Sequence, residues 1–160
     1  MTDVVILRAL ARYVRQVGVF SLEYIEEALV ANPAIARSLV DLFTTRFDPD
    51  LGLDDDAREE RATEQEAGIE AALDQVSSLD QDRILRTLVA VVRASLRTNF
   101  FQRDKDGGPK AHVSVKLRPR ELPMLPEPRP AHEIWVYAPR VEGSHLRFGP
   151  VARGGLRWSD

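Results

Sequence analysis

The sequence predicts an α+β chain in which a helical part, residues 1–102, precedes a part with a few β-strands, residues 103–160. In the first hundred residues, apolar side chains recur at spacings of three and four, the period of an amphipathic helix. After residue 110 they alternate with polar ones, the period of a strand. Residues 1–102 carry 11 Lys+Arg and 18 Asp+Glu, and residues 103–160 carry 11 and 7, so the second part is expected to lie nearer an anionic ligand.

Three short helices are expected before residue 47. The first covers residues 4–17 and is followed by Gly18, which suits a helix C-terminus. Ser21 is expected to cap the second, and Asn32 the third, which begins at Pro33 and runs to about residue 46. The expected buried side chains are Ile6, Leu7, Leu10, Val14, Val17, Leu22, Ile25, Leu29, Ile35, Leu39, Leu42 and Phe43, with Val30 at the edge.

An acidic segment follows. Residues 48–70 hold ten Asp and Glu against Arg58 and Arg61. Residues 56–76 are expected to form an exposed helix with a thin apolar edge at Ile69, Leu73 and Val76. The alternative to a solvated helix face is that these carboxylates bind calcium, but the segment lacks the spaced ligands and the glycine of a calcium loop.

A stronger helix is expected next, capped by Ser78 or Asp80 and ending between residues 97 and 99. Its buried stripe is expected to contain Ile84, Leu85, Leu88, Val91, Val92 and Leu96. Residues 104–110 (DKDGGPK) then predict a loop.

Strands are expected at residues 112–118, 133–138 and 145–148. Five prolines make residues 119–130 an extended loop. Trp135 is expected in the core. Three short strands with one apolar face are marginal alone, so the chain is expected to be part of something larger.

Several classes of site are not expected. The absence of cysteine excludes disulfides, a thiol nucleophile and a cysteine-based zinc site. His112, His132 and His145 fit no zinc spacing. Ser144 and His145 are neighbours on a strand and point to opposite faces, so they do not form a nucleophile–base pair.

Binding of a dinucleotide, of nucleic acid or to a membrane is not expected either. The chain has no G-x-G-x-x-G after a strand, which removes the dinucleotide fingerprint. Its arginines are scattered among prolines, so no nucleic acid is expected. Residues 1–5 show no basic stretch before an apolar one, so no signal peptide is expected. No apolar run reaches the roughly 18 residues that a membrane span needs, so a cytoplasmic location is expected.

The most informative feature is a pair of adjacent glycines near the end of the sequence. Gly154 and Gly155 lie between Arg153 and Arg157, so backbone N–H groups can approach an anion while guanidinium groups supply charge. Arg147 on the preceding strand could point to the same place. Such a site suits a dicarboxylate or a phosphate, and the alternative is a tight turn with surface arginines.

The region around these glycines resembles the entry to the catalytic domain of the large bacterial NAD-dependent glutamate dehydrogenases. The matching blocks are PRVEG at 139–143, HLRFG at 145–149 and VARGGLRWSD at 151–160. The preceding helix and proline-rich loop also look like that family, so the specific resemblance covers roughly residues 75–160. The residues before it match only loosely, as the family's helical region.

The resemblance implies an oxidoreductase of amino-acid catabolism that converts L-glutamate and NAD to 2-oxoglutarate, ammonia and NADH. Residues 103–160 would be the truncated start of an α/β catalytic domain, with the rest of the parent polypeptide and further copies in a homo-oligomer as partners. In the family the catalytic lysines and the NAD site lie beyond the position of Asp160. The fragment is therefore expected to be inactive alone and to hold no catalytic, cofactor-binding or metal-binding residue.

The same glycines also resemble the GGxR turn of the smaller glutamate dehydrogenases. There a lysine just before the two glycines helps to hold the substrate side-chain carboxylate, and here that position is Arg153, whose geometry differs. The resemblance implies that Arg153 contacts the substrate, that Gly154 and Gly155 shape the turn, and that Arg157 contacts substrate or pairs with a carboxylate such as Asp160.

Two alternatives belong to other classes of protein. One is a non-catalytic helical interaction module, which should end in a finished element. The other is a small anion-binding domain that uses residues 153–157 and binds dicarboxylates as the isolated chain.

Overall fold

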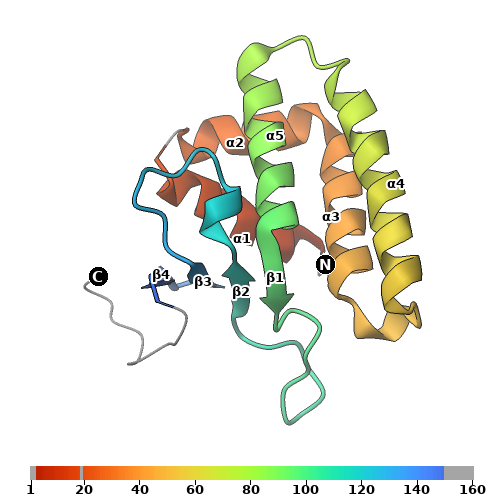
Figure 1. Cartoon of the computed structure of the whole chain (residues 1–160), viewed down its shortest axis with the longest axis vertical. Coiled ribbons are helices and arrows are strands. Elements are labelled where there is room, and N and C mark those ends of the chain that lie inside the picture. Colours follow the sequence, from red (N-terminus) through yellow and green to blue (C-terminus); the bar gives the residue numbers. More distant parts are fainter. Residues whose placement is uncertain (1–2, 19, 150–160) are drawn as a thin grey trace. The chain divides into compact units, whose positions relative to one another are not determined.

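The computed structural model describes residues 3–18 and 20–149. In these residues helices come first and a four-stranded sheet follows, which confirms the α+β class (Figure 1). The chain divides into two compact units, Met1–Val92 and Arg93–Asp160. The predicted boundary at residue 102, between the helical region and the start of the catalytic domain, stays a prediction.

The first unit is built from helices. They are α1 (Asp3–Gln16), α2 (Leu22–Ala31), α3 (Pro33–Phe47), α4 (Asp55–Leu73) and α5 (Leu79–Ala94), with a 3-10 turn at Pro49–Leu51. Helices α1, α2 and α3 contact one another, α3 packs along α4, and α4 and α5 form a hairpin (Figure 1). Among the described residues, no helix combines the length and the apolar character of a membrane span.

Side-chain caps explain where three of these helices begin. Ser21, Asp54 and Ser78 each accept a hydrogen bond from the backbone N–H three residues later, at 3.4, 2.8 and 3.4 Å. Each bond satisfies one of the N–H groups that have no partner within the helix. The prediction of Ser21 is confirmed, and of the two residues considered for α5 the cap is Ser78.

Asn32 takes its expected place before Pro33, but its side chain does not cap α3. Its amide instead donates to the carbonyl oxygen of Ala28 at 2.9 Å and to Oε1 of Gln81 at 3.1 Å. The amide therefore ends α2 and ties that helix to the start of α5.

Apolar side chains at helical spacing form the core of the first unit. Its largest fully buried members are Ile6, Leu10, Tyr13, Ile25, Leu39, Leu42, Phe43, Ile69, Leu73, Ile84 and Leu85. Burying one such side chain contributes about 1.5–3 kcal/mol, so this packing decides the stability of short helices more than propensity does. The buried residues of α4 are Ala62, Ile69 and Leu73, which confirms a thin apolar edge, whereas Val30 of α2 is 79% exposed.

Two arginines bridge neighbouring helices. Arg58 of α4 donates to the carbonyl oxygens of Thr45 and Asp48, at the end of α3. Arg86 of α5 reaches Glu70 of α4, Asp74 just after the end of α4 and Asp82 of its own helix, at 2.6, 3.1 and 2.8 Å. Partial desolvation lowers the pKa of Arg86, but these carboxylates outweigh it and raise that pKa above its ordinary value.

The second unit is an antiparallel sheet in the order β1-β2-β3-β4. Its strands are β1 (Ser95–Thr98), β2 (Val113–Leu117), β3 (His132–Ala138) and β4 (Val141–Arg147). A 3-10 turn at Pro119–Glu121 interrupts the loop that was expected to be extended throughout.

The sequence predictions were wrong at three boundaries. Helix α4 ends at Leu73 and not at 76, so Val76, which was expected on its apolar edge, lies beyond its end. Helix α5 ends at Ala94, before residue 97, because the next residues pair with β2 from Ser95 onward. Pairing with a distant strand outweighs the helical spacing that continues to Leu96. The last strand begins at Val141 and not at 145, because a two-residue connection joins it to β3 in a hairpin.

The loop between β1 and β2 is closed by one aspartate. Oδ1 of Asp104 accepts hydrogen bonds from the backbone N–H groups of Asp106 and Gly108, at 2.9 and 2.8 Å. Gly107 between them has φ +79°, a conformation that other residues adopt only with strain.

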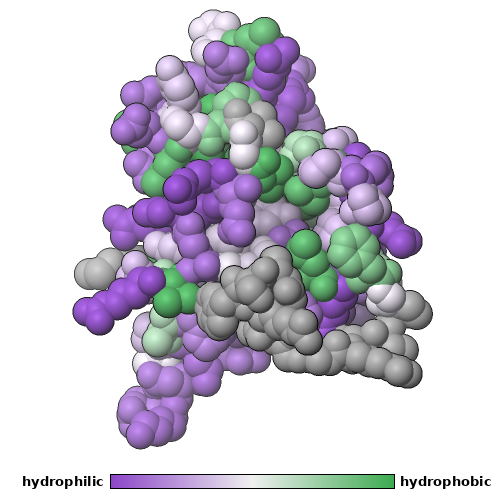
Figure 2. Space-filling view, turned by 90° about the vertical axis from the view of Figure 1, so that its left-hand side faces the viewer, coloured by the Kyte–Doolittle hydropathy of each residue, from purple (hydrophilic) through white to green (hydrophobic). Residues whose placement is uncertain are grey.

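Figure 2 shows hydrophilic side chains over much of the face that it draws, with apolar ones in smaller groups.

Candidate functional site

The residues predicted to bind substrate, Arg153, Gly154, Gly155 and Arg157, lie outside the described residues, as does Trp158. The structure describes the strand that leads to them. Strand β4 ends at Arg147, and the sheet to which it belongs carries the charged groups nearest to the turn in sequence.

The sheet has one buried face. Directly opposed residues of antiparallel strands point to the same side, and alternate residues of a strand share a side. The register therefore puts on one face the buried residues Val113, Val115, Leu117, Glu133 and Trp135. Trp135 is 1% exposed, which confirms its predicted place in the core.

A carboxylate lies on this buried face. Glu133 is 6% exposed, and Oγ of Ser144 on β4 donates a hydrogen bond to it. The sequence did not indicate this hydrogen bond, although the alternation in EIWVY places Glu133 on the same side as Trp135. Ser144 lies opposite Trp135 and His145 opposite Ile134, so the prediction that Ser144 and His145 point to opposite faces is confirmed.

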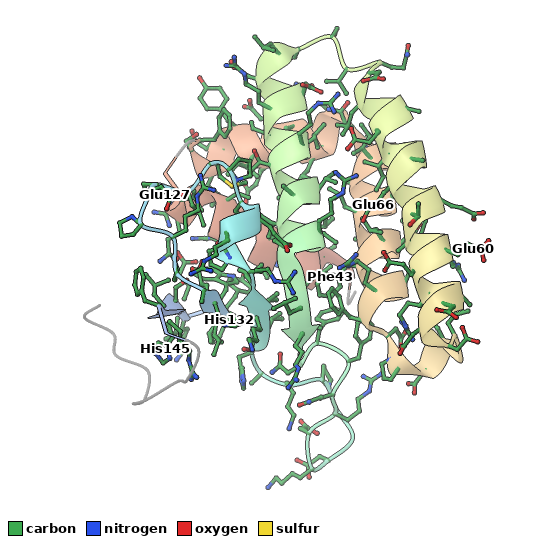
Figure 3. The ribbon with its side chains drawn as sticks, viewed as in Figure 1. Phe43, Glu60, Glu66, Glu127, His132 and His145 are labelled. Carbon is green, nitrogen blue, oxygen red and sulfur yellow. The ribbon has the colours of Figure 1, made fainter. Side chains whose placement is uncertain are left out.

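The other face of the sheet is half-exposed and cationic. One row across it contains Lys116, Ile134 and His145, and the next row contains His132 and Arg147. We call these five residues the cationic face. Figure 3 labels its two histidines, which lie on the adjacent strands β3 and β4.

The pKa of one histidine reflects the charges around the cationic face. Partial burial lowers the pKa of His132 below its ordinary value of 6.5, and nearby positive charges lower it further. Those charges are, in decreasing order, Lys116, Arg118, Arg147 and Arg120. A neutral imidazole among several cations indicates a positive potential at this surface.

Within the part of the chain that the structure describes, three of these four cations have no carboxylate partner. Arg118 forms an ion pair with Glu121. Among the described residues, Lys116, Arg120 and Arg147 have no carboxylate within ion-pair distance, and Nε of Arg147 is buried without a hydrogen-bond partner. The face can therefore attract an anion and donate hydrogen bonds to it.

A concave surface on the first unit has the opposite character. It is lined by Glu23, Glu26, Glu27, Val30, Ala31 and Gln81. Three carboxylates at one surface repel a dicarboxylate, so this region does not suit an acidic substrate. Nowhere in residues 3–18 and 20–149 do three or more His, Asp or Glu side chains form a group that could hold a metal ion.

Two family models match the chain. Residues 68–160 match the model described as bacterial NAD-glutamate dehydrogenase, catalytic domain, and residues 1–49 match glutamate dehydrogenase, helical motif 3. The first match takes in the end of α4, all of α5 and the sheet.

Three relatives are about 50% identical to this chain in sequence, and each is described as an NAD-specific glutamate dehydrogenase. The protein from Pseudomonas aeruginosa is 51% identical over 159 residues, that from Mycobacterium tuberculosis 50% over 161, and that from Halomonas elongata 46% over 159. Each alignment covers 99% of this chain and 10% of the relative, so the chain spans about a tenth of the relatives' length.

Proposed function

Because the chain belongs to the bacterial NAD-glutamate dehydrogenase family, we propose that it is a segment of an enzyme that oxidises L-glutamate with NAD to 2-oxoglutarate, ammonia and NADH. The match of residues 68–160 to the family's catalytic domain carries this proposal. The chain covers a tenth of its relatives, so the activity is proposed for a polypeptide of their length.

Within that enzyme, residues 1–49 serve as a helical motif and the sheet of the second unit leads into the substrate site. The substrate contact is assigned to Arg153, whose guanidinium can hold a carboxylate with two parallel hydrogen bonds. Gly154 and Gly155 shape the turn beside it. Arg157 contacts the substrate or orders the turn by pairing with a carboxylate. The family resemblance of this motif supports these roles.

The activity is tested on the polypeptide of the relatives' length that contains this chain. L-Glutamate and NAD should give NADH, measured by its absorbance, while D-glutamate serves as the matched control. If NADH forms equally with both enantiomers, or with neither, the proposed reaction is wrong. The separate 160-residue chain should give none, because the resemblance assigns NAD binding to other parts of the enzyme.

The role of Arg153 is tested in the same polypeptide. Arg153→Gln should raise KM for glutamate about tenfold or more, because a hydrogen bond to a charged group contributes about 1.5–3 kcal/mol. KM for NAD should stay unchanged, and Arg153→Lys should recover part of the loss. Arg140→Gln removes the same charge from the exposed connection between β3 and β4 and is the control. Equal effects of the two glutamine variants would assign the change to net charge.

We also propose that the enzyme is cytoplasmic and works as a homo-oligomer, as the resemblance implies. Light scattering of the purified polypeptide should give a multiple of its sequence mass, and cell fractionation should recover it with cytoplasmic markers. A monomer mass would remove the oligomer from the proposal and leave the reaction standing.

A further inference from the structure

We propose that the cationic face binds a small anion with two or more negative charges, carried by carboxylate or phosphate oxygens. Its residues are Lys116, His132, Ile134, His145 and Arg147, on three neighbouring strands. The proposed site does not include the turn at residues 153–157, and it goes beyond the glutamate oxidation proposed above.

The register gives this face its shape. His132 lies on the middle strand, with Arg147 directly opposite on β4 and Lys116 diagonally across on β2. Adjacent strands are about 4.8 Å apart and the two rows are about 6.8 Å apart, so the two long cationic side chains stand on either side of the imidazole, about 12 Å from each other at the backbone. Side chains of this length can converge on one anion above His132.

Donor groups that have no acceptor among the described residues also favour an anion site on this face. The backbone of Arg147 is fixed, since its carbonyl oxygen accepts a hydrogen bond from the N–H of Ala131 at 2.8 Å. Its buried Nε has no partner among the described residues, and Lys116 has no carboxylate partner there. A buried donor without an acceptor is destabilising, and a small movement toward a bound anion would satisfy it.

The surroundings strengthen such a contact. Ile134 and Val136 are half-buried on the same face and give the charges an apolar floor. An ion pair in a partly desolvated place is stronger than one in open water. Partial burial is the first cause of the lowered pKa of His132 and the crowded cations are the second, and a bound anion would counter the second of these.

The chain contains three histidines, so imidazole proton NMR can test the site directly. Inorganic phosphate or glutarate is added to the 160-residue chain at constant ionic strength. We expect saturable shifts of His132 and His145 and a rise in the pKa of His132, because an anion favours the charged imidazole. His112, which precedes β2, is the internal reference. Saturation with phosphate, glutarate or both supports the site and identifies the group, whereas no saturation with either overturns it.

Variants separate a built site from general attraction. Arg147→Gln and Lys116→Gln should each weaken binding about tenfold, as expected for the loss of one charge-assisted contact. Lys105→Gln removes the same charge from an exposed loop and should change little. Equal loss in all three variants would overturn the proposal. Loss with Arg153→Gln and none with Arg147→Gln would also overturn it, by placing the anion at the turn.

The same site can be probed in the polypeptide of the relatives' length, which covers the case of a 160-residue chain that folds poorly alone. Diethyl pyrocarbonate acylates neutral imidazoles, and peptide mass spectrometry locates the product. Phosphate or glutarate should protect His132 and His145 and leave His112 reactive. Protection of all three histidines, or of none, would refute the site. This readout needs no glutamate oxidation, so it can fail or succeed independently of the proposed function.

Discussion

The hydrogen bond between Ser144 and Glu133 matters because it satisfies a carboxylate on the buried face of the sheet. Ser144→Ala should lower the free energy of unfolding by about 1.5–3 kcal/mol, the contribution of a hydrogen bond to a charged group. Ser114→Ala is the control, since that half-exposed side chain makes no hydrogen bond to any residue that the structure describes and should change stability by less than about 0.5 kcal/mol. Denaturant unfolding measures both, and equal losses would mean that the carboxylate does not depend on this hydroxyl.

His132 gives the sheet a pH-dependent stability. Its pKa in the folded chain is lowered, first by partial burial and then by Lys116, Arg118, Arg147 and Arg120. As pH falls below the ordinary value of 6.5, the unfolded chain takes up a proton before the folded chain does. The stabilising contribution is therefore complete above that pH and is lost as pH falls through the lowered pKa.

Among the elements, α4 has few buried side chains, so the contribution of its cap should be easy to measure. Asp54→Ala removes the hydrogen bond to the N–H of Ala57 and should cost about 0.5–2 kcal/mol. Asp56→Ala removes a first-turn charge without a cap and should cost about 0.3–1 kcal/mol. Thermal unfolding compares the variants, and a larger loss for Asp56→Ala would show that charge near the helix end matters more than the cap.

The elements that were predicted best from the sequence are those whose spacing and capping residues lie within the element itself. Helices α1 to α4, with the cap at Ser21, follow from spacing and end residues within a few positions. Strand β1 was missed, because SLRT continues an apolar helical pattern and becomes a strand through pairing with residues almost twenty positions later. Alternation alone could not show that Lys116, His132 and Arg147 share a face, since that depends on how three strands are aligned.

At the scale of the whole molecule, the two compact units differ in both charge and structure. Residues 1–92 carry 9 Lys+Arg and 18 Asp+Glu, whereas residues 93–160 carry 13 and 7. Helices form the first unit, and a four-stranded sheet is the main regular structure described in the second. Attraction of an acidic substrate or of a phosphate is therefore expected from the second unit, which also contains the turn assigned to glutamate.

This division makes a prediction about unfolding, because each unit has its own spectroscopic signal. Both tryptophans lie in residues 93–160, so fluorescence follows the second unit, while far-UV circular dichroism mainly follows the helices of the first. Lowering the pH from about 8 to about 5.5 should move the fluorescence transition to lower denaturant, because histidine titrates in this range and His132 lies in the second unit. The helical transition should move less, since all three histidines lie after residue 92.

His132→Gln removes the titrating group and should abolish most of the fluorescence shift, while His112→Gln should leave it in place. Coincident transitions that shift together would mean that the two units unfold as one cooperative body. A shift that persists in His132→Gln would assign the pH dependence to groups other than this imidazole. A fluorescence shift that His132 alone controls would show that partial burial and the cations of the sheet face together destabilise the protonated histidine, and the contribution of the cations is the part that an anion would relieve.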